Sequence, residues 1–294
     1  MCIRDRDIRA IFAGLVFALI WSSAFTSARI IVADAPPMLA LSLRFLISGL
    51  IGIGIARLIG QSWKLTPEQW KATIVFGICQ NALYLGLNFV AMQTIEASLA
   101  SIIASAMPLA VGFSGWIIFG ERLSGLGVFG LFVGAFGVAL IMGVRLQGGA
   151  DLIGLLLCII GMVSLTVATL VVRGASSGGN LLMIVGLQML IGSVLLAIPG
   201  FLLEQPTVVF TPSLIIAFLY TVLMPGLIAT FIWFWLVGRI GAVKAATFHF
   251  LNPFFGVAIA AFFLGENLRL SDMLGVIVIM AGILAVQLAR QTSD

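Results

Sequence analysis

Charged side chains are scarce in this sequence. Asp, Glu, Lys and Arg make up 9% of its 294 residues, whereas hydrophobic residues make up 62%. Soluble domains carry roughly 25% charged residues, so this composition excludes an ordinary water-soluble fold. A helical crossing of a bilayer needs about 20 apolar residues, which leaves room for about ten crossings and short loops. The sequence therefore predicts an all-α membrane protein surrounded by a lipid bilayer.

Metal ligands and paired cysteines are also few. The chain has one histidine, His249, and three cysteines, of which Cys79 and Cys158 lie inside apolar runs. This set builds neither a disulfide framework nor a zinc site, so we expect no metal and no cofactor. The net charge of +4 comes from basic residues between apolar segments, where they set membrane orientation. We therefore expect no nucleic-acid partner.

Ten apolar runs separated by charged residues, glycine or proline predict ten membrane spans. The runs cover residues 10–32, 37–58, 70–91, 97–119, 124–144, 152–173, 181–203, 212–237, 243–264 and 270–289. The first run is too long for the core of a signal peptide, so we expect it to remain as a span.

Basic residues collect on one side of these spans. One side carries Arg29, Arg145 and Arg269, while the other carries Arg4, Arg6, Arg9, Arg57, Lys64, Lys71, Arg122, Arg173, Arg239, Lys244 and Arg290. The positive-inside rule then places both termini in the cytoplasm, and we expect a bacterial inner membrane protein.

The second half of the sequence repeats the first at an offset of 145 residues. Five features pair at that offset: Pro108 with Pro253, Gly120-Glu121 with Gly265-Glu266, Leu123 with Leu268, Gly130 with Gly275, and Gly137 with Gly282. We expect two repeats, residues 7–144 and 151–290, with five spans each. Because five is odd, the second repeat enters the membrane from the opposite side, which predicts an inverted repeat typical of carriers.

Several strings resemble the EamA-type drug/metabolite transporter superfamily. They are Trp21-Ser22-Ser23-Ala24-Phe25, Arg44-Phe45, Pro108 followed by Gly120-Glu121-Arg122-Leu123, and Pro253 followed by Gly265-Glu266-Asn267-Leu268. The resemblance covers essentially the whole chain. It implies a ten-helix basket with spans 1 to 4 and 6 to 9 around a central cavity, and a function like that of the YddG-like exporters of amino acids and related metabolites.

Pro108 and Pro253 lie at the centres of their predicted spans. Proline removes a backbone hydrogen bond and displaces the carbonyl four residues earlier, which belongs to Ala104 for Pro108 and to His249 for Pro253. Such kinks are tolerated where they face protein or a wet cavity. We expect Pro108 and Pro253 to act as hinges, although static kinks that help helices fit are the alternative.

Polar and aromatic residues mark an expected binding site for a small-molecule substrate. Aromatic walls with a few hydrogen-bonding groups suit a small amphipathic metabolite. His249 is either a proton-sensitive switch or a neutral donor to a nearby backbone carbonyl. The spacing of Asn81, Tyr84 and Asn88 places them on one helical face. The expected substrate-binding residues are Trp21, Ser22, Tyr84, Asn88, Trp233, His249 and Asn252.

No carboxylate lies at the middle of a predicted span. Proton-for-cation exchange needs such a buried acid, so we expect neutral, zwitterionic or anionic substrates. Arg44, inside span 2, is either a structural anchor or a partner for a substrate carboxylate. Glu121 and Glu266, which follow glycines at span ends, are expected to cap or anchor helix ends.

Gly130 and Gly134 form a GxxxG pattern in span 5, which favours close packing against span 10. We expect a monomer, with a dimer as the alternative. The sequence as a whole predicts a secondary transporter, an exporter of small amino-acid-like or related metabolites that works by alternating access. The alternatives are an importer of a vitamin or nucleoside-like metabolite, a channel and a membrane enzyme. We do not expect an enzyme, because the sequence offers no HExxH motif and no carboxylate pair inside the membrane.

Overall fold

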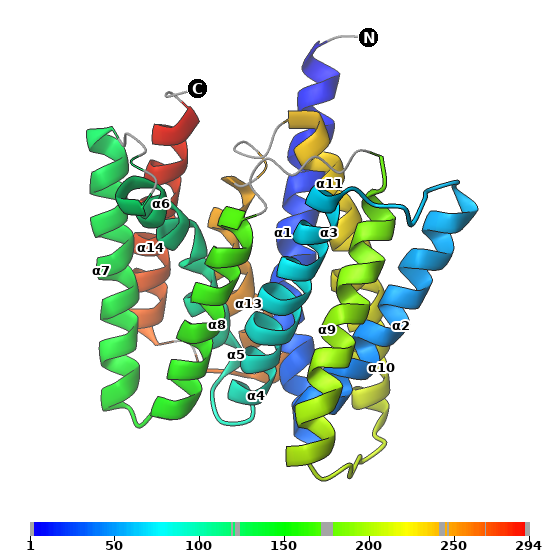
Figure 1. The fold of residues 1–294 in the computed structure, drawn as a ribbon. Coiled ribbons are helices and arrows are strands. Elements are labelled where there is room, and N and C mark those ends of the chain that lie inside the picture. The colour runs from blue at the N-terminus through cyan, green and yellow to red at the C-terminus, as the bar shows by residue number, and fades with distance from the viewer. Residues whose placement is uncertain are drawn as a thin grey trace. The chain divides into compact units, whose positions relative to one another are not determined.

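The computed structural model describes residues 3–118, 120, 124–171, 179–240, 245, 247–267 and 269–291. Within these ranges every regular element is a helix (Figure 1). The first half holds α1 (Ile3–Asp34), α2 (Pro37–Leu58), α3 (Pro67–Val75), η1 (Phe76–Leu85), α4 (Gly86–Ala91), α5 (Ala97–Ser105), α6 (Met107–Ile118) and α7 (Gly125–Gln147). The second half holds α8 (Leu152–Val171), α9 (Leu181–Leu203), α10 (Pro212–Thr221), η2 (Val222–Ile228), α11 (Ala229–Ile240), η3 (Thr247–Leu251), α13 (Asn252–Leu264) and α14 (Leu270–Gln291).

Nine helical stretches in the described residues are long and apolar enough to cross a membrane, and Phe248–Leu264 is a shorter apolar helix in the position of the ninth span. The all-α prediction and the ten-span organisation are therefore confirmed. Helix α1 is longer than predicted, because it begins at Ile3 instead of residue 10.

Local sequence signals explain several helix ends. Thr66 caps α3 through a capping box with Gln69, and Pro67 fills the first turn, where its missing N–H costs nothing. Gly120 and Gly265 follow spans 4 and 9, and both adopt a positive φ of 65°, which glycine tolerates without strain. The glycines of the two Gly-Glu motifs thus adopt the same backbone conformation after equivalent spans.

The chain forms two compact units, and each takes segments from both predicted repeats. Unit 1 comprises Met1–Thr26, Glu96–Leu152 and Phe231–Asp294, and unit 2 comprises Ser27–Ile95 and Ile153–Thr230. Each unit therefore pairs spans that are distant in the sequence.

In unit 1, α7 packs along α14 through glycines (Figure 1). Gly130 lies against Ala285, and Gly134 lies against Gly282. A Cβ atom on Gly130 or Gly282 would collide with the facing helix, and a Cβ atom on Gly134 would collide with Leu109 of α6, so this packing requires glycine at all three positions. The predicted packing of the GxxxG pattern against span 10 is confirmed.

In unit 2, α2 packs along α9 in the same manner. A Cβ atom on Gly49 would lie 2.9 Å from the carbonyl oxygen of Gly186, and a Cβ on Gly186 would lie 2.9 Å from the carbonyl oxygen of Gly49. About two helical turns from these glycines, the hydroxyls of Ser42 and Ser193 each donate to the other residue's carbonyl oxygen, at 2.9 and 2.8 Å. Small residues let two backbones approach, and the hydroxyls join them.

These contacts define chain direction. Along α2, moving from Ser42 to Gly49 moves the contact on α9 backward, from Ser193 to Gly186. The helices of spans 2 and 7 are therefore antiparallel, and the contacts of α7 with α14 show the same for spans 5 and 10. Because equivalent spans of the two repeats run in opposite directions, the repeat is inverted, as predicted.

Candidate functional site

An aromatic cluster in unit 1 surrounds His249. The ring centroid of His249 lies 5.0 Å from that of Trp233, 5.3 Å from that of Phe17 and 6.4 Å from that of Trp21. Phe17 also contacts both tryptophans. Phe17 is buried, whereas Trp21 and Trp233 are half-buried. The cluster thus joins the first span to the eighth and ninth.

Hydrogen bonds fix the polar part of this cluster. The side-chain amide nitrogen of Asn252 lies 2.9 Å from Nδ1 of His249, and the hydroxyl of Ser22 donates to the backbone carbonyl of Asn252 at 3.3 Å. The Phe248 ring lies directly over Gly14 of α1, where only a glycine leaves room. Trp21, Ser22, Trp233, His249 and Asn252 therefore come together, while Trp235 instead lies beneath the guanidinium of Arg239.

Both predicted hinge prolines lie where a span changes its helical form. Helix α5 ends at Ser105 and α6 begins at Met107, directly before Pro108. The 3-10 helix η3 ends at Leu251, and Pro253 lies in the first turn of α13. Since proline cannot donate a helical hydrogen bond, each break lies where the sequence removes a donor.

Tyr84 and Asn88 belong to unit 2, in η1 and α4. The amide of Asn88 donates to the carbonyl of Tyr84 at 2.8 Å and accepts from the thiol of Cys158 at 3.3 Å. Gly161 of α8 packs directly against both residues. Tyr84 and Asn88 thus contact one another and α8, and both are buried.

Arg44 is a buried cation in unit 2. Its Nε donates to the carbonyl oxygen of Thr221 at 3.2 Å, and its guanidinium carbon lies 4.9 Å from the ring centre of Phe45. Thr221 stands four residues before Pro225, which cannot supply the α-helical donor to that carbonyl. No carboxylate within the described ranges forms an ion pair with Arg44. This hydrogen bond joins α2 to the end of α10 in span 8.

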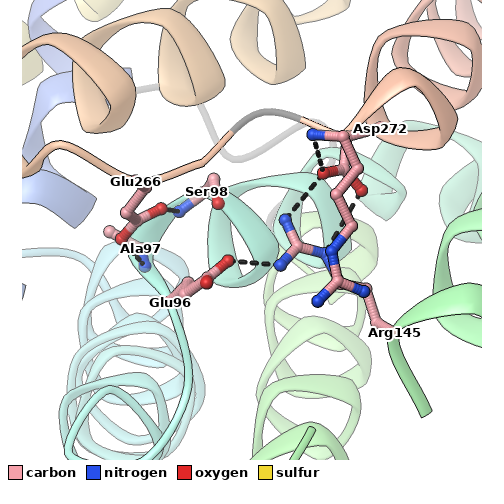
Figure 2. A network of polar contacts seen from close by, with 7 residues as sticks. Glu96, Ala97, Ser98, Arg145, Glu266 and Asp272 are labelled. Carbon is pink, nitrogen blue, oxygen red and sulfur yellow. Dashed lines mark hydrogen bonds and ion pairs between the residues drawn. The ribbon is translucent and has the colours of Figure 1, made fainter. Parts of the chain in front are cut away.

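A polar network ties together the helix ends of unit 1 (Figure 2). The two carboxylate oxygens of Glu266 accept from the backbone N–H groups of Ala97 and Ser98 at 2.8 and 3.0 Å, at the start of α5. Beside it, Arg145 contacts Glu96 and binds both oxygens of Asp272 at 3.2 and 2.7 Å. The expectation that Glu266 caps a helix is confirmed, and the helix is α5 of the other repeat. Glu121 lies outside the described residues.

In unit 2, two helix starts are capped by side chains from elsewhere in the fold. Glu204 accepts from the N–H groups of Met38 and Leu39 at 2.8 and 3.0 Å, and Gln61 accepts from the N–H of Met183 at 3.0 Å. Each end of the α2–α9 pair is thus capped by the partner helix. The carboxylates of Glu204, Glu266 and Asp272 are committed to these contacts. Among the described residues, no three His, Cys, Asp or Glu side chains gather in a way that could hold a metal ion.

Sequence reasoning missed Phe17 and the two π-helical segments. Phe17 stands four residues before Trp21, a spacing that places both on one helical face, so helical periodicity could have found it. The π-helices η1 and η2 occupy matching positions in spans 3 and 8, and Pro225 marks the second. Such wide turns are frequent at functional sites.

Antiparallel pairs of equivalent spans, with helices interrupted near their centres, define the architecture of a membrane carrier with an inverted repeat. The model of the EamA-like transporter family matches residues 8–143 and again residues 152–288. The protein therefore belongs to the EamA-like transporter family, and it is a multi-pass membrane protein. This membership points to a transporter and not to an enzyme.

Similar proteins span nearly the whole chain. The uncharacterized transporter YvbV of Bacillus subtilis is 30% identical over 271 residues, which cover 90% of this chain and 87% of its own. The uncharacterized inner membrane transporter YedA of Escherichia coli K12 is 26% identical, covering 98% and 94%. One crystal structure matches with a TM-score of 0.69 over 97% of this chain and 99% of its own, and its 21% identity shows the fold alone.

Proposed function

We propose that this protein is a secondary transporter, an exporter of small amino-acid-like or related metabolites that works by alternating access in the bacterial inner membrane. Both termini lie in the cytoplasm in this proposal, and the protein acts as a monomer. The observation that carries it is the antiparallel packing of equivalent spans, such as α2 on α9. An inverted repeat offers two conformations of similar energy, open to opposite sides of the membrane.

The duplication supports the same proposal. We assign residues 7–144 and 151–290 to two repeats that arose from one five-span ancestor. The family model matches the chain twice, at residues 8–143 and 152–288, which agrees with these bounds. Pro108 and Pro253 act as matched hinges, because each removes a helical donor at a break in its span.

The proposed substrate contacts are Trp21, Ser22, Trp233, His249 and Asn252 in unit 1, and Tyr84 and Asn88 in unit 2. The first group is supported by its mixture of half-buried tryptophan rings and hydrogen-bonding groups. Arg44 is the candidate partner for a substrate carboxylate, because its buried guanidinium has no acidic partner among the described residues.

A second candidate is an importer of a vitamin or nucleoside-like metabolite. It is favoured by the lack of any ionic contact to the His249 cluster in the described part of the chain. A neutral ring needs no counter-charge, whereas a zwitterion that leaves water does.

Transport by the purified full-length protein in proteoliposomes tests both candidates. Radiolabelled amino acids, amines and vitamins are offered with and without a pH gradient, and saturable uptake with counter-flow is expected for a carrier. Linear flux without counter-flow would identify a channel instead.

The site assignment is tested in the same vesicles. Asn252→Ala and Tyr84→Ala are each expected to lower flux at least tenfold while the protein still elutes as a single folded species. If both variants transported substrate as fast as the parent protein, the assignment of these residues to the substrate site would be wrong. If His249→Gln transported normally at every pH, His249 would not be a proton-sensitive switch.

A further inference from the structure

Unit 1 contains buried oxygen atoms that have no hydrogen-bond partner. They include the side-chain oxygen of Asn252 in α13 and the hydroxyls of Ser98 and Ser101 in α5. Asn252 is 6% exposed, and Ser101 packs against Gly256, one turn further along α13. Buried polar atoms are nearly always paired in folded proteins, so an unpaired acceptor indicates a partner from outside the chain.

The hydrogen bond between Asn252 and His249 determines what this site offers. An amide nitrogen only donates, so Nδ1 of His249 accepts, and the ring proton of the neutral imidazole resides on Nε2. Nε2–H therefore remains a donor, while Oδ1 of Asn252 remains an acceptor. The pair presents one donor and one acceptor to a ligand.

The walls of the site are aromatic. Trp21 and Trp233 are both in contact with the His249 ring, and both are half-buried. Phe17 is 1% exposed and only supports them. Offset stacking on an indole favours a planar ring.

The site is also uncharged. In the part of the chain that the structure describes, no acidic or basic side chain other than His249 itself forms a hydrogen bond or ion pair with Trp21, Trp233, His249 or Asn252. The ion pairs described in unit 1 are those of Arg145 with Glu96 and Asp272. A zwitterion bound here would lose its hydration without gaining a counter-charge, which is far costlier than burying a neutral amide.

We infer that this cluster binds an uncharged planar heterocycle that carries both an N–H donor and a carbonyl acceptor, as lactams and nucleobases do. The ligand N–H donates to Oδ1 of Asn252, its carbonyl accepts from Nε2–H of His249, and its ring packs on Trp21 and Trp233. The hydroxyl of Ser22 donates to the backbone carbonyl of Asn252 in the same site. The inference rests on the proposed carrier, because the ligand is the transported molecule, and it favours the second candidate substrate, a neutral ring, over an amino-acid-like one.

Binding to the purified full-length protein tests this inference. Uracil and hypoxanthine are compared with 1,3-dimethyluracil, which lacks both N–H donors, with the anionic orotate, and with phenylalanine. Tryptophan fluorescence and the shift in apparent melting temperature report binding. Uracil or hypoxanthine is expected to bind at least tenfold more tightly than the other three compounds.

Variants separate the site from general stability. Asn252→Leu is expected to remove uracil or hypoxanthine binding. Ser105→Ala is the matched control, because the Ser105 hydroxyl is already satisfied by the carbonyl of Ser101 at 2.7 Å, and it is expected to bind like the parent.

Three results would overturn the inference: no binding of either lactam, equal binding of dimethyluracil by the parent protein, or undiminished binding by Asn252→Leu. The comparison of ligands on the parent protein decides the question even if Asn252→Leu fails to fold. Saturable amino-acid flux without lactam binding would refute this inference and leave the proposed exporter intact. Lactam binding without flux of any compound would refute the carrier instead.

Discussion

Arg44 illustrates how one buried side chain repairs a backbone defect in a neighbouring helix. Pro225 leaves the carbonyl of Thr221 without its α-helical donor, and the Nε atom of Arg44 donates to that oxygen. Ser48, one turn further along α2, donates to the next carbonyl, that of Val222, at 3.2 Å. Two side chains of one helical face thus hold the first turn of η2.

We predict that Arg44→Met lowers stability by about 1–3 kcal/mol, because a buried carbonyl loses a charge-assisted bond. The apparent melting temperature in detergent should fall by several degrees. Arg44→Gln retains an N–H donor and should recover part of the loss.

Equal melting temperatures of the parent and Arg44→Met would contradict the anchor. Full stability of Arg44→Gln together with lost flux would assign the guanidinium to a substrate carboxylate, so the two measurements separate the roles that the sequence left open.

Helix ends in this protein are capped across the fold as well as locally. Glu266 spans the first two N–H groups of α5 with both oxygens, and Glu204 does the same at α2. The first N–H groups of a helix lack internal partners and attract negative charge, so a carboxylate from a neighbouring helix is well placed there. Each cap ties the end of one helix to the start of its partner.

We predict that Glu266→Ala destabilises the protein by about 1–2 kcal/mol, the range for loss of a charged helix cap. Glu266→Gln keeps one acceptor and should lose less. The measurement is thermal unfolding of the purified protein in detergent.

Asn267→Ala is the matched control for this prediction, because its exposed side chain forms no contact described above. If Glu266→Ala and Asn267→Ala melted at the same temperature, the cap would contribute nothing to stability.

On the scale of the whole molecule, the antiparallel pair α2 and α9 places the loops that follow them at opposite ends of unit 2. The loop after α2 lies among Arg57, Lys64 and Lys71, whereas the loop after α9 carries Glu204. The positive-inside rule assigns the first loop to the cytoplasm.

We predict opposite labelling of two cysteines introduced into a variant that lacks Cys2, Cys79 and Cys158. In whole cells a membrane-impermeant maleimide should label Gln205→Cys, while Trp63→Cys should react only after permeabilisation. The reverse pattern would place both termini outside.

The sequence by itself determined the ten spans, their inverted order and the positions of the breaks at Pro108 and Pro253. These follow from local properties: the bilayer demands long apolar runs, proline lacks an N–H, and an odd number of spans reverses direction.

Apart from the packing of span 5 on span 10, only the tertiary structure decided which helices pair and which polar groups are used in packing. For example, the amide of Asn81 donates to the carbonyl of Gln188 at 2.9 Å, and the amide oxygen of Asn88 accepts from the thiol of Cys158. The carboxylate of Glu266 accepts from a backbone N–H at the start of α5. The physical reason lies in the membrane. Lipid and protein interior are equally apolar, so hydrophobicity does not show which face of a span packs against its neighbour. That face is determined by close contact of glycines, hydroxyls and amides.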